Sequence, residues 1–218
     1  MDVRDYDLES FGTILTDLGA ANRFTLAARP TLAFLAQLTD GWPTGTELRV
    51  ADLGYGDGTM LRLVHGWAQA RGLSPRLTGV DMNPRCRALA EARTPPAMGI
   101  DWHEGDLFDW QPAARPHAII SSLFAHHLAD ADIVRLLAWQ DITASHGWFV
   151  NDLHRHWLAW SGFRALAFAM RWHPCVRHDG ALSVRRAFVA DDWTRLLAAA
   201  GVAGARIRWH PLFRLCVG

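Results

Sequence analysis

The sequence predicts an α/β protein with a seven-stranded, mostly parallel sheet that is covered by helices on both faces. Apolar, strand-like runs alternate with segments of helical periodicity between residues 48 and 153, which is typical of a parallel sheet with helical crossovers. Residues 205–217 then form two short runs around a tight turn at His210–Pro211. These runs predict an antiparallel hairpin at one edge, which completes the seven strands.

The alternating region divides into five strands and three helices. Strands are expected at residues 48–54, 76–82, 100–106, 117–123 and 147–153. Helices are expected at residues 59–72, 84–93 and 130–143, with Gly72 as a stop signal and Asp130 as an N-cap. The fourth strand is apolar on both faces, as expected where helices cover both sides of a sheet.

Further helices are expected outside this region, at residues 6–20, 25–39, 156–172 and 191–201, and Pro30 marks a start or a kink in the second. The 218 residues have the length of one large domain. We expect this domain to comprise an N-terminal helical segment (1–47), an α/β core (48–153), a helical insert (154–188) and a C-terminal helix and hairpin (189–218).

The charged residues exclude several classes of function. All 22 basic residues are arginine and are balanced by 22 acidic residues. Without lysine, the chain has no P-loop lysine, no Schiff-base lysine and no lysine general base. Without net positive charge, it is a poor partner for nucleic acid or an anionic membrane.

The remaining composition predicts a soluble, reduced, cytoplasmic protein. The three cysteines are widely spaced and form no CxxC pair, which argues against a disulfide framework and a zinc site. The N-terminus is acidic and polar, unlike a signal peptide. Arg or His interrupts every apolar stretch before it could span a membrane.

The strongest motif follows the first strand, in VADLGYGDGT (50–59). An acidic residue leads three alternating glycines, Asp52-x-Gly54-x-Gly56-x-Gly58. Such glycines allow a sharp turn and a close approach of the backbone to a ligand. The spacing is not the GxGxxG of dinucleotide sites, and the acidic lead favours a cationic ligand over a pyrophosphate.

Two further acids end the next strands: Asp81 in GVDMNP and Asp106 in EGDLFDW. A carboxylate at the position of Asp81 can bind both hydroxyls of a ribose. Because the carboxyl ends of the strands in an open α/β sheet line one crevice, the three acids are expected to lie along the same site.

These three acidic strand ends and the glycine turn resemble the class I S-adenosylmethionine-dependent methyltransferases, whose sheet is Rossmann-like. The resemblance covers about residues 48–153, and the edge hairpin is similar to the reversed last strand of that family. It implies S-adenosylmethionine as cofactor and S-adenosylhomocysteine as product, with residues 1–47 as a lid. The cofactor-binding residues implied are Asp52, Gly54, Tyr55, Gly56, Gly58, Asp81, Met82, Asp106, Leu107, Ser121, Ser122, Leu123 and, from the lid, Arg23.

Histidines after the fourth and fifth strands are the candidate bases. His126 and His127 lie in a stretch similar to that of methyltransferases acting on quinones and polyketides, and His154 follows the fifth strand. A histidine can remove a proton from an acceptor hydroxyl near neutral pH. Packing or helix capping is the alternative role for His126 and His127, and an Asp152–Arg155 salt bridge is the alternative for the loop of His154.

The helical insert is the candidate acceptor site. Trp157 and Trp160 are proposed to contact a flat acceptor, with Arg155 beside them, although such an aromatic stripe is more often part of a core. Arg185-Arg186 are either solvated or hold an acidic group of the substrate. Metal-dependent catechol methyltransferases bind magnesium through an Asp-Asn pair after the fifth strand. Here the order is Asn151-Asp152, and the fourth strand ends in serines instead of aspartate, so no metal is expected.

The stretch from residue 151 to 188 looks most like small methyltransferases associated with polyketide synthases. We therefore expect O-methylation of a phenolic or polyketide hydroxyl. C-methylation of an aromatic or quinone precursor and a non-catalytic cofactor-fold binding module are the alternatives. A nicotinamide-dependent reductase is disfavoured because both GxGxxG and a Tyr-x-x-x-Lys dyad are missing. A homodimer is left open.

Overall fold

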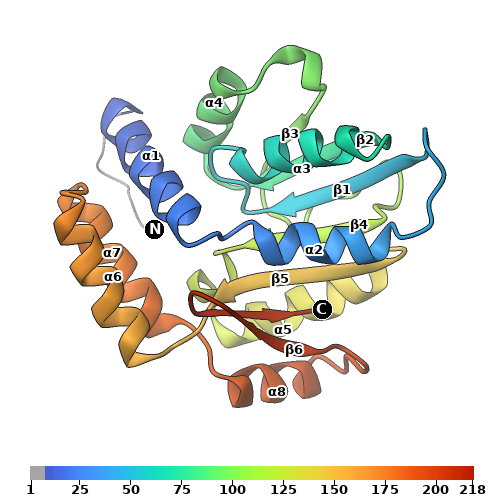
Figure 1. Ribbon diagram of the computed structural model, residues 1–218. Helices are drawn as coiled ribbons and strands as arrows, with labels where there is room; N and C mark the ends of the chain where they lie inside the picture. The colour runs from blue at the N-terminus through green and yellow to red at the C-terminus, as the bar shows by residue number, and fades with distance from the viewer. Residues whose placement is uncertain (1–7) are drawn as a thin grey trace.

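The computed structural model describes residues 8–218 and arranges them around one seven-stranded sheet (Figure 1). The strands are β1 (Glu47–Leu53), β2 (Ser74–Asp81), β3 (Asp101–Glu104), β4 (Ala118–Ser122), β5 (Gly147–Leu153), β6 (Ile207–His210) and β7 (Arg214–Val217). Their order is β3-β2-β1-β4-β5-β7-β6. Strands β1 to β5 are parallel and β7 runs antiparallel to both neighbours, so the predicted sheet and edge hairpin are confirmed.

Helices cover both faces of the sheet and also its carboxyl edge. They are α1 (Leu8–Phe24), α2 (Arg29–Leu38), α3 (Thr59–Ala70), α4 (Pro84–Arg93), α5 (Asp130–Thr143), α6 (Trp157–Ala169), α7 (Pro174–Arg186) and α8 (Ala190–Ala199), with 3₁₀ turns at Pro96–Met98 and Ala125–His127. Among residues 8–218, no helix is long and apolar enough to cross a lipid bilayer.

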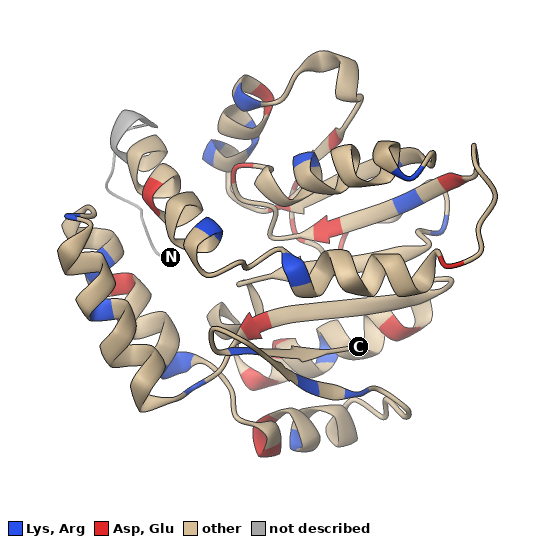
Figure 2. Ribbon diagram, viewed as in Figure 1, with Lys and Arg blue, Asp and Glu red and all other residues tan. Residues whose placement is uncertain are grey.

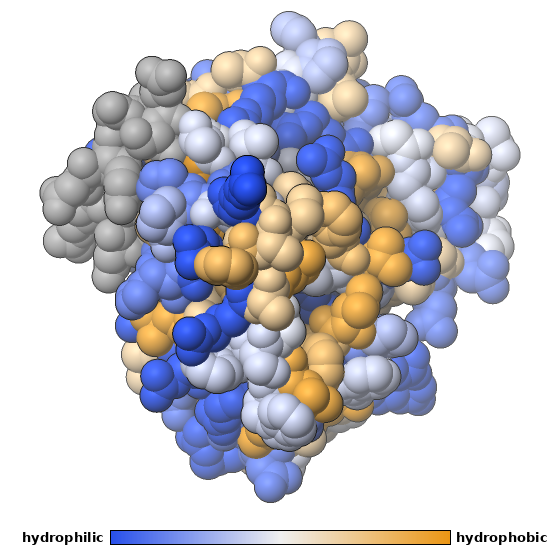
Figure 3. Space-filling view, turned by 60° about the vertical axis from the view of Figure 1, so that its left-hand side comes forward, coloured by the Kyte–Doolittle hydropathy of each residue, from blue (hydrophilic) through white to orange (hydrophobic). Residues whose placement is uncertain are grey.

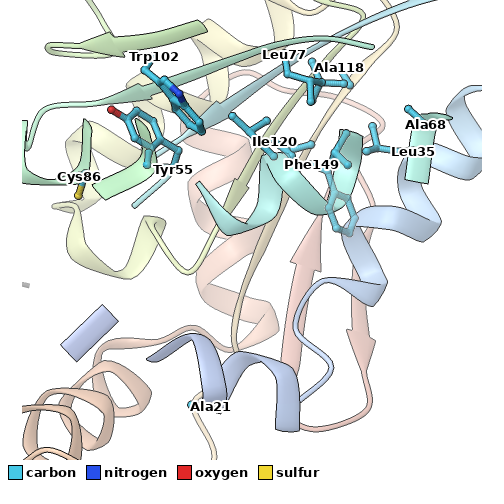
Figure 4. Close-up of a cluster of buried hydrophobic side chains, with 14 of the residues drawn as sticks. Ala21, Leu35, Tyr55, Ala68, Leu77, Cys86, Trp102, Ala118, Ile120 and Phe149 are labelled. Atoms are coloured by element: carbon cyan, nitrogen blue, oxygen red, sulfur yellow. The ribbon is translucent and has the colours of Figure 1, made fainter. Parts of the chain in front are cut away.

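Side chains that alternate along the strands pack into two hydrophobic clusters, one on each face of the sheet. Val50 and Ile120 point into a cluster with residues of α2, α3 and α4, which Figure 4 shows in part. Ala51 and Ile119 point to the other face, where α5 and α8 pack and Trp193 is fully buried. Burial on both faces explains why these strands read as continuous apolar runs.

Helices α1, α6 and α7 gather beside the carboxyl ends of the parallel strands (Figure 1). Phe11 and Ile14 of α1 are buried in the same cluster as Val176 of α7. The backbone N–H of His173, at the start of α7, donates to Asp17 of α1 at 2.8 Å. These contacts join the N-terminal segment and the insert into one helical cap.

The insert holds two helices where one was expected. Arg171 has a φ of 52°, which ends α6, and Pro174 stands in the first turn of α7 while the His173 side chain caps its N-terminus. Gly180 of α7 lies directly against the ring of Phe163, so a side chain there would collide with α6. This close packing of α6 on α7 shapes the insert.

Three smaller expectations are wrong. Asp130 is the first residue of α5 rather than its N-cap, which is Ala129; its carboxylate pairs with Arg195 at 2.9 Å. The hairpin turn spans residues 211–213, because His210 still belongs to β6. Strand β3 ends at Glu104, before Asp106. Of the two roles expected for Pro30, a helix start or a kink, the structure confirms the start, because Pro30 stands in the first turn of α2.

Candidate active site

The carboxyl ends of the central strands are brought to one edge by the parallel register. Leu53 of β1 pairs with Val80 of β2 and with Ser121 of β4, and Ser122 pairs with Asn151 of β5. Acidic residues stand at the ends of β1 and β5 (Figure 2). The strand order reverses between β1 and β4, which is where open α/β sheets form their ligand crevice.

The glycine turn after β1 requires glycine for two different reasons. Gly54, Gly56 and Gly58 all have positive φ values, of 72°, 58° and 76°. A Cβ on Gly54 would also collide with the ring of Phe124, whereas a Cβ on Gly56 would meet nothing within 4 Å. The turn is therefore packed at Gly54 and open at Gly56, where a ligand can approach the backbone.

Asp52 carries an unusual carboxylate at the end of β1. The side chain is buried, and among residues 8–218 its Oδ1 has no hydrogen-bond partner. Burial, reinforced by the charge of Asp81, raises the pKa of Asp52 well above its ordinary value. A buried, unpartnered carboxylate is costly, so this site favours a cationic ligand group.

Asp81 is held in place by backbone hydrogen bonds. Its Oδ2 accepts from the N–H of Gly56 at 3.1 Å and its Oδ1 from the N–H of Asn83 at 2.9 Å. Burial raises the pKa of Asp81, although the two hydrogen bonds act to lower it. Met82 follows and is 73% exposed, which provides an apolar surface beside the carboxylate on which a planar group can pack.

The other predicted residues near β2 and β3 are placed differently. Asp106 is exposed and accepts the N–H of Phe108 at 2.9 Å, while Leu107 is buried in the core. The side chain of Tyr55 is also in the core, with its ring 4.8 Å from that of Trp102 (Figure 4). Tyr55 therefore contributes its backbone to the glycine turn and its side chain to the core.

The end of β4 contains polar groups and a strained residue. The Ser121 hydroxyl is buried and has no partner within the described chain. Ser122 Oγ lies 3.5 Å from Oγ1 of Thr31. Leu123 has a φ of 58° and donates its N–H to the carbonyl of Asn151 at 2.9 Å. A left-handed leucine is rare, and such strain tends to occur at functional sites.

His126 and Asp152 form a buried pair between the ends of β4 and β5. His126 Nδ1 lies 2.7 Å from Asp152 Oδ1, and the His126 backbone N–H donates to Oδ2 at 3.2 Å. Although burial opposes it, the charge of His126 together with these bonds lowers the pKa of Asp152. An ionised carboxylate on Nδ1 fixes the ring orientation and leaves Nε2 as the nitrogen able to accept a proton.

The other two candidate histidines, His127 and His154, both have lowered pKa values. Desolvation, together with the nearby charges of His126 and Arg186, lowers the pKa of His127 to about 3. Within residues 8–218, His154 Nδ1 is buried without a hydrogen bond, and burial together with His156 lowers the pKa of His154. His126, in contrast, has its Nδ1 within 2.7 Å of the Asp152 carboxylate.

Arg155 does not pair with Asp152, so the salt bridge considered for that loop is absent among residues 8–218. Arg155 Nη2 instead lies 2.8 Å from Asp192, and its Nη1 donates to the Ala187 carbonyl at 3.2 Å. Arg23 is exposed in the last turn of α1.

Trp157 and Trp160 line a pocket of about 310 Å³ between the start of α6 and the end of α7. Its other lining residues are Arg155, His156, Val184 and Arg185. The two tryptophans thus face open space instead of a closed core. No three His, Cys, Asp or Glu side chains of residues 8–218 come together in a way that could hold a metal ion.

Several site residues were missed from the sequence. Arg214 of β7 is buried beside Asp152, its Nη2 donates to Thr25 Oγ1 at 2.9 Å, and burial lowers its pKa to about 10. Arg93 joins Asp57 of the glycine turn to α1. Each contact links residues more than 30 positions apart, so no local pattern could reveal it.

Comparison with known proteins agrees with this geometry. Residues 50–140 match the family model described as "Methyltransferase domain". The chain is 32% identical over 164 residues to the trans-aconitate 2-methyltransferase of Streptomyces avermitilis, covering 71% of this chain. The chain spans 58% of the length of that relative.

Two solved structures share the fold. A SAM-dependent methyltransferase from Aquifex aeolicus aligns with a TM-score of 0.64 at 12% identity, covering 98% of this chain and 97% of that one. The CMeT domain of the citrinin polyketide synthase aligns with a TM-score of 0.62 at 15% identity, covering 87% of this chain and 51% of that one. The chain belongs to the class I S-adenosylmethionine-dependent methyltransferases.

Proposed function

We propose that this protein transfers the methyl group of S-adenosylmethionine to a hydroxyl oxygen of a small phenolic or polyketide acceptor, with His126 as general base. The observation that carries this proposal is the buried His126–Asp152 pair. Phe124, two residues before His126, packs on Gly54, so the pair stands next to the glycine turn.

The residues at the carboxyl edge fit the cofactor of this class. The unpartnered Oδ1 of Asp52 suits an ammonium group, and the fixed carboxylate of Asp81 suits ribose hydroxyls. The open space at Gly56 allows close approach to the backbone. When bound, the cofactor supplies an electrophilic methyl group on a sulfonium.

The residues of the chain must remove the proton of the acceptor hydroxyl and align the acceptor. A hydroxyl is a much better nucleophile after losing its proton, and His126 Nε2 is the acceptor that Asp152 leaves available. Asp152 stays ionised because its pKa is lowered, so it continues to hold Nδ1–H and supports the positive charge that His126 gains. Alignment of the acceptor oxygen with the methyl group supplies the remaining rate acceleration.

The acceptor is proposed to bind in the pocket at α6 and α7. Trp157 and Trp160 offer aromatic faces there, which suit a flat ring. His156 lines this pocket, and its ring centroid lies 5.7 Å from that of His154, the residue that directly follows β5. The pocket therefore adjoins the end of β5.

The test is a methyl-transfer screen of the full chain over phenols, quinols and polyketide lactones, read by mass spectrometry. We expect a mass gain of one methylene unit on a phenol or polyketide, lost in His126→Gln. Saturable S-adenosylhomocysteine binding without transfer to any acceptor of these classes would contradict the proposed acceptor and favour a binding module.

C-methylation is the second candidate, because the citrinin synthase CMeT domain shares this fold. The same base would then remove a ring or chain proton. Fragmentation of the product separates the two outcomes: a methyl group on oxygen supports the first proposal and a methyl group on carbon supports the second.

A further inference from the structure

The pocket between α6 and α7 combines aromatic and cationic side chains. Two tryptophans and two arginines are among the six residues that line it. Trp157 is 70% exposed, which is a large apolar surface to leave in water. The arginines lie where α6 begins and α7 ends, and basic residues are visible at that end of α7 in Figure 2.

The two arginines are not equivalent. Arg155 is committed to Asp192 and to the Ala187 carbonyl. Arg185 is exposed, and its guanidinium takes part in none of the ion pairs found within residues 8–218. Arg185 therefore has hydrogen-bond donors available for a ligand, whereas Arg155 holds the pocket wall to α8.

The pocket and the candidate base lie on elements that contact each other. Helix α7 packs against the Ala125–His127 turn. Arg186, the neighbour of Arg185, is near enough to contribute to the lowered pKa of His127. Arg155 follows Asp152 by three residues at the end of β5. A ligand anchored at the end of α7 would therefore be bound on a helix that contacts the turn containing His126 and His127.

We infer that the pocket selects a planar aromatic acceptor that carries a carboxylate, with Arg185 as the residue that binds this group. The inference rests on the proposed function, because it identifies the acceptor class of the same site. Tryptophan faces accept the ring, and a guanidinium fork matches the two oxygens of a carboxylate. Arg185 is thus a specificity residue, separate from the proton chemistry of His126.

The test titrates the full chain, without cofactor, with matched acid and amide pairs that have the same shape and differ in charge. The pairs are 4-hydroxybenzoate with 4-hydroxybenzamide, and 6-hydroxy-2-naphthoate with its amide. Quenching of tryptophan fluorescence reports binding. At least one acid is expected to bind about tenfold more tightly than its amide.

Arg185→Met is expected to remove the preference for the acid while leaving amide binding unchanged. Arg177→Met is the matched control, because it removes the same charge from an exposed position of the same helix outside the pocket. An acid preference that survives in Arg185→Met, or no acid that outbinds its amide in either pair, would overturn the inference.

Calorimetry with S-adenosylhomocysteine on the same samples separates this inference from the proposed function. Binding of S-adenosylhomocysteine without any preference for the acids contradicts the acceptor class alone. Preference for the acids without S-adenosylhomocysteine binding contradicts the methyltransferase reaction and leaves the carboxylate site standing.

Discussion

The raised pKa of Asp52 makes ligand binding depend on pH. Its pKa is raised by burial and by Asp81, so the carboxylate loses its charge at a higher pH than an exposed one. A cationic ligand group needs the ionised form. The affinity for a cationic ligand is therefore highest above the raised pKa of Asp52 and falls as the pH drops through that pKa.

We predict that Asp52→Asn binds S-adenosylhomocysteine about ten- to a hundredfold more weakly, the value of one charged hydrogen bond (~1.5–3 kcal/mol). Its affinity should also lose the acid-side decline of the wild type. Asp101→Asn, at the exposed start of β3, is the control and should bind like the wild type. Calorimetry over a pH series measures both; an Asp52→Asn curve parallel to the wild type would contradict the assignment.

The second residue-scale prediction concerns the base. His126→Gln should lower kcat by about 10²–10⁴-fold, the usual contribution of a positioned proton acceptor, and Asp152→Asn should lower it too by releasing Nδ1. His127→Gln should change kcat little, because the lowered pKa of His127 makes it a weak base.

Steady-state kinetics on the acceptor found by the screen measures these effects. S-adenosylhomocysteine binding and thermal unfolding of each variant distinguish lost chemistry from lost folding. A folded, cofactor-binding His126→Gln with wild-type kcat would remove His126 from the mechanism.

At the scale of elements, the glycine turn couples β1 to the segment that follows β4. Gly54→Ala should destabilise the fold by more than Gly56→Ala. Both substitutions put alanine at a positive φ, a cost of ~1–2 kcal/mol, but only the Cβ at Gly54 meets the Phe124 ring. We expect an extra ~1–3 kcal/mol from overpacking. Urea unfolding measures the difference, and equal losses would contradict this packing.

A second prediction at this scale concerns Arg93, which ties α4 to the turn and to α1. It contacts Asp57 at 2.8 Å, the Gly12 carbonyl at 3.0 Å and Thr16 at 3.1 Å. Arg93→Met should therefore speed amide hydrogen exchange in α1. Arg87→Met is the control, because its surface pair with Glu91 contributes little. Equal exchange in the two variants would show that Arg93 does not hold the cap.

The element boundaries that the sequence predicts best have local signals. Helix α4 begins as expected because Asn83 caps it and Pro84 fits its first turn. Helix α7 is not predictable in this way, because its cap is a histidine and its stability depends on the contact of Gly180 with Phe163. The acids at strand ends are predictable because parallel strands end together, whereas the pairing of His126 with Asp152 spans 26 residues.

At the scale of the whole molecule, three segments distant in sequence meet at the carboxyl edge: α1, the turn after β4, and the α6–α7 insert. Figure 3 shows the side of the molecule on which the cap lies, where apolar and hydrophilic patches alternate. The proposed site uses carboxylates, backbone groups and an imidazole, so it is compatible with a chain that lacks lysine. The division into lid, core, insert and hairpin stays a proposal.

The central claim is that the carboxyl edge of this sheet binds the methyltransferase cofactor. Isothermal titration of the full chain with S-adenosylhomocysteine at neutral pH tests it most directly. The structure predicts saturable binding of one ligand per chain, weakened in Asp52→Asn. A folded protein that shows no binding at high micromolar ligand would contradict the claim.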